Sequence, residues 1–456
     1  MDFSENYNIL LKQMTCDVNK RKLIHQINQN SPLLPFKTNT PKKANFENGF
    51  DIILGELSRI LLNKTIEKNF KLDNIVSNLI DNNIEIEDGT KEYITKLLNE
   101  YLFDEKNDLK ISHPNLYLYI PLSNNKSSNG EQEVALFLRD IFCKNNQNLI
   151  NFFESYDSNH IILNLILKNT PNLHHKITET KYVIHFEEIA NLFNEDINYA
   201  ILYKKFFMEN IGNIFAYYYF FYISQLILKI SKGFNDNNEF EKLYYLLDWE
   251  SASKNRKSLN SYSLLKHHSK PLYAKMAVID QINTLLGTNN LLEKDISEYF
   301  NNLDINSKNN FLHFLKKWVS DYRYVRNFDD KELPDNLLEL TEILFESLKN
   351  EKLGVDGAVQ SRYALNLEDI AKKYLLKRRG SYGYVLNINR DMLLVLTALC
   401  VKDKKIKLNQ LFIEFEKRGV YFDKYSKEEV VNFLTKLNLI DKKSDSGDAQ
   451  YVKPVL

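Results

Sequence analysis

Glycine and proline are scarce in this chain of 456 residues, which contains 13 Gly and 9 Pro. Average usage, about 7% Gly and about 5% Pro, would supply several dozen of the two together. Sharp turns depend on them, because glycine reaches positive φ and proline fixes φ. The chain is long enough for roughly three domains. We therefore predict a mainly α-helical protein with few tight turns.

Cysteine is also rare. Cys16, Cys143 and Cys400 are an odd set without CxxC spacing, which argues against a disulfide framework and a structural zinc site. Three thiols of this kind suit a reducing cytoplasm. Residues 1–13 lack the basic patch and unbroken apolar run of a secretory signal. We expect a cytoplasmic protein.

The chain has no net charge, with 60 Lys and Arg against 60 Asp and Glu. This excludes a uniformly polycationic nucleic-acid coat. The charge is unevenly spread, however. Residues 361–456 contain 19 basic and 12 acidic residues, a net of +7, whereas residues 1–360 contain 41 and 48, a net of −7. A basic module on a mildly acidic body is compatible with a local nucleic-acid contact.

One uncharged run, residues 210–228, is close to the ~20 residues that span a bilayer. It contains Asn213, Ser224, Gln225 and four tyrosine hydroxyls, each of which would need a partner in hydrocarbon. A helix that is apolar all round is also found at the centre of large helical domains. We predict a buried core helix and no membrane contact.

Helical periodicity runs along most of the chain and indicates three domains. The first, residues 1–122, is helical and ends in a β-like run at 115–122. The polar stretch 123–130 marks a boundary. Residues 131–356 form a central helical domain, and residues 357–456 a C-terminal domain. No repeat of 20–50 residues supports a solenoid.

The sequence of the C-terminal domain predicts a definite order of helices and strands. In sequence, the pattern predicts a helix at 390–401, a helix at 408–419 that ends at Gly419, a helix with a capping box at Ser426 and Glu429, and a hairpin around Gly447. Three helices followed by a hairpin are typical of a winged helix. The predicted fold is thus a multi-helical body with a C-terminal winged-helix module.

A winged helix that binds duplex DNA inserts its third helix in the major groove and places its wing over the phosphates. The predicted contacts are Arg378, Arg379, Lys427, Asn432, Lys436, Lys442, Lys443 and Lys453. Cations on phosphates release counterions, so affinity should fall steeply with salt. Glu428 and Glu429 oppose phosphate at the start of the third helix. The alternative is a protein-docking module.

A second basic stretch, residues 254–275, holds six Lys or Arg and no acid. It predicts a secondary basic loop formed by Lys254, Arg256, Lys257, Lys266 and Lys270. Such a loop could contact a nucleic-acid backbone. The alternative is a solvated or partner-facing loop.

Catalytic motifs are missing from the sequence. There is no GxxxxGK[ST], no HExxH and no GxSxG. The HxK patterns at His174 and His268 lack an Asp five positions beyond the lysine, where Lys181 and Lys275 stand. We predict no catalytic residue, no cofactor and no metal site. A divergent metal-dependent nuclease within residues 131–360 stays open as an alternative.

Three stretches within residues 357–456 carry a resemblance to a known family. They are KRRGSYGYVLNINRDMLLVLTALCVKD, EFEKRGVYFDKYSKEEVV and LNLIDKKSDSGDAQYVKPVL. They resemble the conserved end of the DptG family, the G component of bacterial phosphorothioation-dependent DNA restriction systems. The resemblance implies a cytoplasmic antiviral defence protein that acts with ATPase and helicase-like components against DNA lacking the sulfur-modified backbone. It supplies no catalytic residues.

These observations predict a non-catalytic subunit of a restriction complex that contacts DNA or serves as an adaptor. Its expected partners are duplex DNA and the ATPase and helicase-like components. Two other hypotheses stay open: a divergent metal-dependent nuclease subunit, and a protein scaffold that does not contact DNA.

Overall fold

A computed structural model of the protein describes residues 2–456 except 28–31, 48, 68–75, 78–79, 81–89, 106–108, 157, 159, 169, 254–255 and 443–449. The described chain is mainly α-helical, as predicted. Strands are short and form small sheets.

The N-terminal half contains α1 (Ser4–Gln13), α2 (Asp51–Leu61), α4 (Lys91–Leu102), α5 (Ser128–Leu138), α6 (Gln147–Glu154), α7 (Ile161–Lys168), α8 (Glu187–Leu202) and α9 (Lys204–Lys232). Between them lie the 3-10 helices η1 (Thr40–Lys42), η2 (Pro114–Tyr119) and η4 (Gly233–Asn235), the π-helix η3 (Arg139–Cys143), and the strands β1 (Lys64–Thr65) and β2 (His174–His175). Strands β1 and β2 pair antiparallel.

The C-terminal half contains α10 (Ser258–Ser269), α11 (Leu272–Leu286), α12 (Glu293–Asn301), α13 (Ile305–Val325), α14 (Leu337–Lys349), α15 (Gly357–Tyr374), α16 (Arg390–Val401), α17 (Leu408–Lys417) and α18 (Lys424–Lys436). Its other elements are β3 (Leu246–Leu247), β4 (Leu376–Arg378), η5 (Gly380–Tyr382), β5 (Tyr384–Ile388), β6 (Ile406–Lys407), β7 (Ile440–Lys442) and β8 (Gln450–Val452). The sheet orders are β3-β5-β4 and β6-β8-β7.

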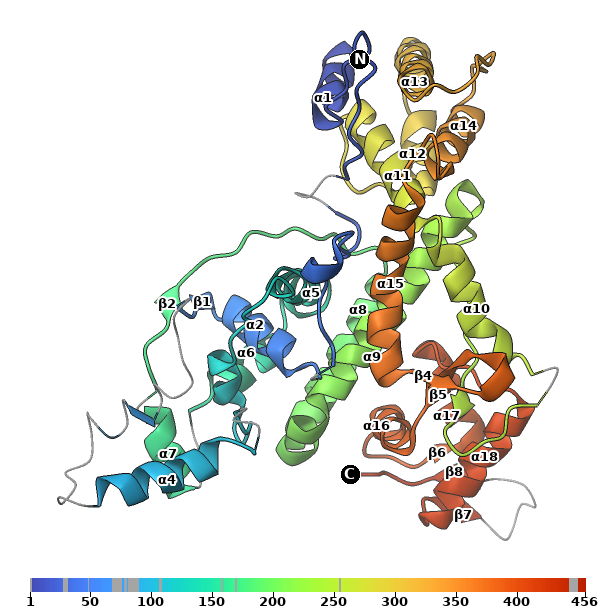
Figure 1. Cartoon of the computed structure of the whole chain (residues 1–456). Helices are drawn as coiled ribbons and strands as arrows, with labels where there is room; N and C mark the ends of the chain where they lie inside the picture. Colours follow the sequence, from blue (N-terminus) through green and yellow to red (C-terminus); the bar gives the residue numbers. More distant parts are fainter. Residues whose placement is uncertain are drawn as a thin grey trace.

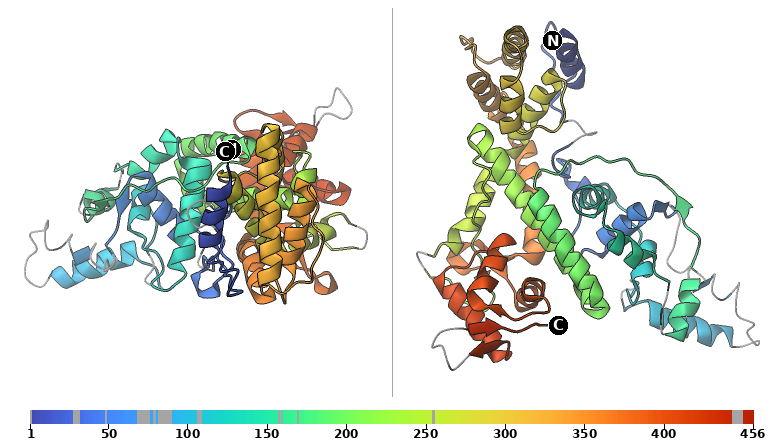
Figure 2. Two further views of the ribbon diagram at one scale, coloured as in Figure 1. Left: turned by 90° about the horizontal axis from the view of Figure 1, so that it is seen from above. Right: turned by 180° about the vertical axis from the view of Figure 1, so that it is seen from behind.

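The helices are arranged around α9 and α15, which run side by side through the middle of the molecule (Figure 1). Helices α2, α5 and α6 lie to one side, with α4 and α7 at their outer end. Helices α1 and α11–α14 lie at one end of the molecule, and α16–α18 lie at the other end with strands β4 to β8. The view from behind shows the same three groups (Figure 2).

Helix α9 is the buried centre of the fold. The stretch Lys204–Asn235 has the length and hydropathy of a membrane span, alone among the helices of the described residues, but 89% of its most apolar window is buried inside the chain. Several of its polar groups have partners inside the fold: Tyr218 donates to Asp196 at 2.5 Å, and Gln225 exchanges two hydrogen bonds with the backbone of Glu241. The prediction of a buried core helix for this run is confirmed.

The main hydrophobic core is continuous from Phe3 to Val452 and includes residues from all three predicted domains. A second, smaller core lies between η2, α4 and α7. The proposed boundaries near residues 123–130 and 356 stay predictions. Trp318 and Tyr322 of α13 are fully buried, which agrees with the core role that aromatic residues at helical spacing usually have.

The prediction of a β-like run at residues 115–122 is wrong, because most of this segment is the 3-10 helix η2. Its apolar character has another cause. Leu116 and Leu118 pack into the smaller core, whereas Tyr117 packs into the main core. The segment is buried between two cores, so a continuous apolar run arises without a strand.

The basic stretch 254–275 is mostly helical rather than a loop. Helix α10 occupies Ser258–Ser269, and it buries Tyr262 and Leu265 while its lysine, Lys266, is exposed. The basic pattern of the sequence obscured this apolar pair, which lies three positions apart on one helix face.

Two histidines should make the protein less stable in acid. Burial lowers the pKa of His25 and of His185 to about 4, whereas an unfolded histidine titrates near 6.5. Between these values the unfolded chain binds more protons, so the free energy of unfolding falls as the pH drops from 6.5 to 4. Both side chains are half-buried, and we expect about 1–2 kcal/mol from each, less than the full shift implies.

Urea unfolding at pH 7 and pH 5 measures this effect. The variant His185→Asn should show a smaller loss between the two pH values than the control His175→Asn, because the side chain of His175 is exposed. An equal loss in both variants would contradict the assignment.

Candidate nucleic-acid interface

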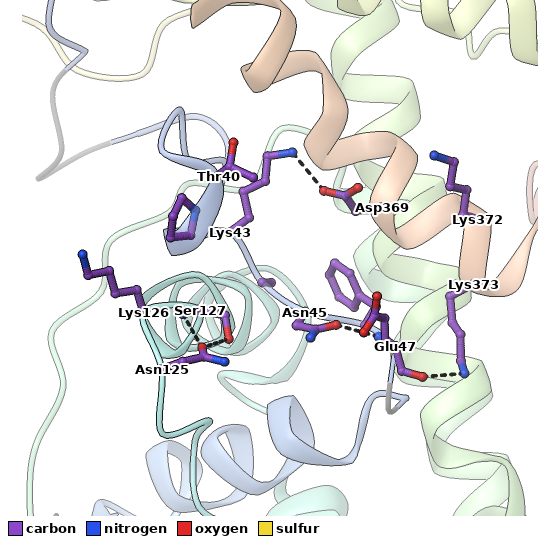
Figure 3. A pocket seen from close by; sticks show the side chains of 13 residues that line it. Thr40, Lys43, Asn45, Glu47, Asn125, Lys126, Ser127, Asp369, Lys372 and Lys373 are labelled. Carbon is purple, nitrogen blue, oxygen red and sulfur yellow. Dashed lines mark hydrogen bonds and ion pairs between the residues drawn. The ribbon is translucent and has the colours of Figure 1, made fainter.

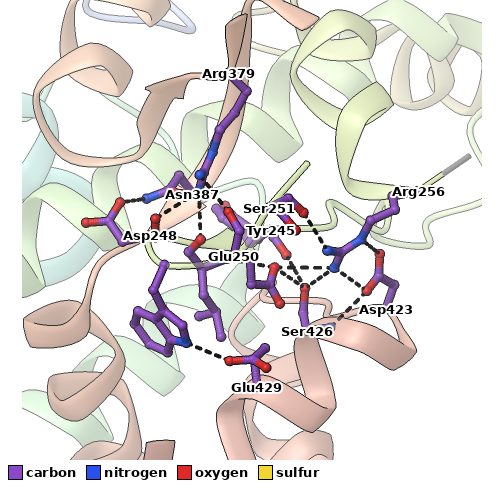
Figure 4. A network of polar contacts seen from close by, with 12 residues as sticks. Tyr245, Asp248, Glu250, Ser251, Arg256, Arg379, Asn387, Asp423, Ser426 and Glu429 are labelled. Atoms are coloured by element: carbon purple, nitrogen blue, oxygen red, sulfur yellow. Dashed lines mark hydrogen bonds and ion pairs between the residues drawn. The ribbon is translucent and has the colours of Figure 1, made fainter. Parts of the chain in front are cut away.

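A buried ionic network fixes the start of α18 to the segment that precedes α10 (Figure 4). Nε and Nη2 of Arg256 donate to the two carboxylate oxygens of Asp423 at 2.9 and 2.6 Å. Nη2 also lies 2.7 Å from Oγ of Ser426 and 3.3 Å from Oε2 of Glu250. Arg256 is 7% exposed. It therefore joins two parts of the chain that are 167 residues apart.

The predicted capping box at Ser426 is corrected by this network. Helix α18 begins at Lys424, and its N-cap is Asp423, whose side chain accepts the backbone N–H of Ser426 at 3.0 Å. Ser426 is fully buried and accepts a hydrogen bond from Arg256 instead. The sequence contained a signal for this cap, because aspartate is as good an N-cap residue as serine.

The pKa values of the two acids in the network, Asp423 and Glu250, are shifted in opposite directions. Burial opposes ionisation of Asp423, but hydrogen bonds from Arg256 and from the Ser426 N–H outweigh it, and its pKa is lowered. Burial dominates at Glu250 and raises the pKa of that carboxyl, even though Arg256 lies beside it. Asp423 is thus the firmly ionised partner of Arg256.

Arg379 has a related structural role. Its guanidinium donates to the backbone oxygens of Glu250 and Leu247 at 2.8 and 2.7 Å and to Oδ1 of Asn387 at 2.9 Å (Figure 4). Asn387 in turn donates to Asp248 at 2.6 Å. These bonds hold the β4–β5 hairpin on the 247–250 turn and direct the Arg379 guanidinium inward.

Beside the network lies a groove of about 710 Å³. Its polar lining combines Lys257, which flanks α10, with Lys424, Lys427 and Asn432 of α18. Three of these residues were predicted contacts from two distant parts of the sequence, and the fold brings them together. We refer to these four residues and the surface between them as the α18 groove.

The three lysines of the α18 groove differ in their surroundings. Lys257 lies 5.3 Å from the ring centre of Tyr244. Lys427 pairs with Glu416 at 3.3 Å and lies 5.0 Å from the ring centre of Phe412. Lys424 is exposed and has no ion pair within the described part of the chain. The acids in the lining are Asp423, which Arg256 neutralises, and Glu428.

Glu429, the second carboxylate expected to oppose phosphate, does not line the groove and has partners within the chain. It accepts a hydrogen bond from Nε1 of Trp249 at 3.0 Å, and the indole packs on Phe433 with ring centres 5.0 Å apart. This contact reduces the opposition to phosphate expected at the start of α18. Trp249, Tyr244 and Lys424 were all missed from the sequence. No local pattern links Trp249 to a glutamate 180 residues away.

The other predicted contacts lie outside the α18 groove. Arg378 is exposed on β4, Lys436 is exposed at the end of α18, and Lys453 lies 3.4 Å from Asp441. On α10, Lys266 lies 3.7 Å from Glu368, and Lys270, just after the helix, is exposed. Lys442 ends β7, whereas Lys443 and Lys254 fall outside the described residues.

Within the described ranges, no group of three or more His, Cys, Asp or Glu side chains is placed to hold a metal ion. The histidines of the two HxK patterns have other partners. His174 is on β2, 2.9 Å from Glu67, and His268 is on α10 beside Ser231.

Comparison with known proteins gives little to set beside this geometry. No protein-family model matches the chain. The chain is similar to protein Ycf2 of Physcomitrium patens, with 25% identity over 458 aligned positions. The alignment covers 90% of this chain but 20% of that protein, so the chain spans about a fifth of the length of this relative. A similarity of this extent does not place the chain in a family.

Proposed function

We propose that this chain is a non-catalytic subunit of a phosphorothioation-dependent restriction complex and that it contacts duplex DNA through a C-terminal winged helix. The order of elements supports the winged helix. Helices α16, α17 and α18 are followed by β7 and β8, and β6, between α16 and α17, completes an antiparallel sheet in the order β6-β8-β7. In this reading α18 is the third helix, and the paired strands β7 and β8 belong to the wing. The predicted turn around Gly447 lies outside the described residues.

The observation that carries the proposal is the convergence of three lysines at the α18 groove. Lys257, Lys424 and Lys427 come from two segments far apart in sequence and face one hollow of the surface. Phosphate contacts of this kind supply most of the sequence-independent affinity of a DNA-binding protein. Asn432 lines the same groove, and an asparagine amide can pair with the edge of adenine.

The adaptor part of the proposal rests on the resemblance in residues 357–456 and on the charge split. A body with a net charge of −7 has little attraction for DNA, so it suits contacts with proteins. The ATPase and helicase-like components are the partners that the resemblance implies. Chemistry on the DNA would belong to those components.

The triple variant Lys257→Ala/Lys424→Ala/Lys427→Ala should bind duplex DNA at least about tenfold more weakly at 100 mM salt. Each lysine that leaves a phosphate removes one released counterion, so the slope of log affinity against log salt should become shallower by about 0.9 per residue. Fluorescence anisotropy with a labelled duplex of 20–30 base pairs, from roughly 50 to 200 mM salt, measures both quantities.

The matched control is Lys20→Ala/Lys96→Ala/Lys205→Ala, which removes the same charge from exposed lysines elsewhere. It should leave the affinity and the salt slope nearly unchanged. If both triple variants weaken binding equally, the α18 groove has no special role. If the protein does not bind duplex DNA even at low salt, the proposal of a DNA contact is wrong and the scaffold hypothesis gains support.

A further inference from the structure

A second large pocket, of about 900 Å³, lies where three segments meet (Figure 3). One wall is the stretch around η1, residues 40–47. Another wall is the loop at the start of α5, residues 125–127, and the third is the C-terminal half of α15. The sequence marked residues 123–130 as a boundary but predicted no site in these segments, and none of them contributes to the α18 groove.

Several charged side chains line this pocket. Its lining contains four lysines, Lys43, Lys126, Lys372 and Lys373, and two acids, Glu47 and Asp369. The formal charge of the lining is therefore +2. Four ammonium groups and a net charge of +2 favour an anionic ligand that carries more than one negative charge.

Internal contacts leave donors free on these lysines. Lys43 pairs with Asp369 at 2.9 Å, and Nζ of Lys373 donates to the backbone oxygen of Glu47 at 2.8 Å. Lys126 is exposed and has no ion pair with any residue that the structure describes. An ammonium carries three protons, so Lys43 and Lys373 each keep donors after these contacts.

Lys372 is held in its charged form by an acid that is not part of the pocket lining. It pairs with Glu368 at 2.6 Å, and this hydrogen bond raises its pKa. Glu368 is fixed in turn by the hydroxyl of Tyr262, which donates to it at 2.9 Å. The ammonium of Lys372 is therefore anchored from outside the pocket.

The walls of the pocket are held in place by close contacts and hydrogen bonds. Gly130 lies so close to residues 42–44 that a Cβ at this position would be 2.1 Å from the backbone nitrogen of Ala44. The loop before α5 is fixed by Asn125, which accepts the N–H and the hydroxyl of Ser127 at 2.8 and 2.5 Å. A preformed site loses less conformational entropy when it binds its ligand.

The volume and the lining of the pocket indicate which class of ligand it fits. A volume of about 900 Å³ falls within the range of small-molecule sites. Phe46, the aromatic residue of the lining, is 5% exposed and offers little face for stacking a base. We propose that this pocket binds a small anion with several phosphates, of the size of a triphosphate, and that it reads the phosphates rather than a base. This site goes beyond the proposed contact with DNA.

Calorimetric titration with sodium tripolyphosphate, ATP and adenosine tests the proposal at low salt. Tripolyphosphate and ATP should bind with similar affinity, and adenosine should not bind. The double variant Lys126→Ala/Lys372→Ala should weaken the binding of tripolyphosphate at least about tenfold, because each removed ammonium takes away a charge-assisted hydrogen bond. The two ammonium groups lie at the surface, and an unchanged melting temperature would show that the variant is folded.

Two controls separate this pocket from general attraction to anions. The variant Lys96→Ala/Lys205→Ala removes the same charge elsewhere, and the triple variant of the α18 groove removes more; both should bind tripolyphosphate like the wild type. The inference is overturned if the wild type gives no binding signal with tripolyphosphate, if Lys126→Ala/Lys372→Ala binds it normally, or if adenosine competes with it. DNA binding by the pocket variant should be unchanged, so the two proposals can fail separately.

Discussion

Replacement of Arg418 by methionine should lower the free energy of unfolding by about 3–5 kcal/mol. Arg418 follows α17 and is 1% exposed. Its Nε and Nη2 donate to the two carboxylate oxygens of Asp196 on α8 at 2.8 and 2.6 Å. Tyr218 of α9 donates to the same carboxylate. Without the guanidinium, Asp196 would be a buried charge with no cation beside it, which is the costly case for an ion pair.

The loss would be a large share of the 5–15 kcal/mol that stabilises a typical domain. Urea denaturation, followed by circular dichroism, measures it. Lys417→Met is the matched control, because Lys417 is the neighbouring residue, is exposed and pairs with Glu414 at 2.8 Å. We expect this control to lose less than about 1 kcal/mol.

The double variant Asp196→Leu/Arg418→Met gives a sharper test of the cause. It removes the unpaired charge as well as the guanidinium, so it should recover part of the stability that Arg418→Met loses. The double variant could instead be less stable than Arg418→Met by the full cost of a second core substitution. That result would mean that lost packing, rather than the stranded carboxylate, explains the loss of stability.

Arg256→Ala should cost about 3 kcal/mol and should also weaken DNA binding. Arg256 neutralises Asp423 and lies beside Glu250, and the side chains of these two acids are 10% and 2% exposed. Breaking a buried ion pair strands the carboxylate. Asp423 also lines the α18 groove, so its freed charge would repel phosphate. Lys257→Ala, at the adjacent position, should leave stability nearly unchanged, because that side chain is exposed.

The pH dependence of the stability of Arg256→Ala tests whether a stranded carboxylate causes the loss. A stranded buried carboxylate has a raised pKa in the folded protein, so the folded state binds more protons than the unfolded state as the pH falls. The difference in free energy of unfolding between the wild type and Arg256→Ala should therefore become smaller as the pH falls from 7 to 5. A deficit that is the same at both pH values would contradict the role of Arg256 as the counter-ion.

Local patterns in the sequence predict the helices of this protein well, and tertiary contacts explain where the predictions fail. The helix at 390–401 has the predicted bounds, and Gly419 has the predicted positive φ of 77°, because both depend on residues close in sequence. The start of α18 was misplaced, since Ser426 and Asp423 are both good caps and their contacts with Arg256 decide between them.

The candidate site is less predictable for the same reason. Lys257, Lys427 and Asn432 were identified by charge and polarity, but nothing in the sequence places them in one groove. Arg256 and Arg379 have the same basic character, yet they are used inside the fold. Whether an arginine faces a phosphate or a backbone carbonyl depends on segments more than 100 residues away.

The attachment of α18 to the 244–256 segment has a consequence for the order of events during synthesis. Arg256, Trp249 and β3 leave the ribosome well before Asp423, Glu429 and β5, with which they pair. Chains are made from the N-terminus and begin to fold as they emerge. The C-terminal helices therefore pack on segments that are synthesised earlier, and the Arg256–Asp423 pair can form only after Asp423, 167 residues beyond Arg256, has been translated.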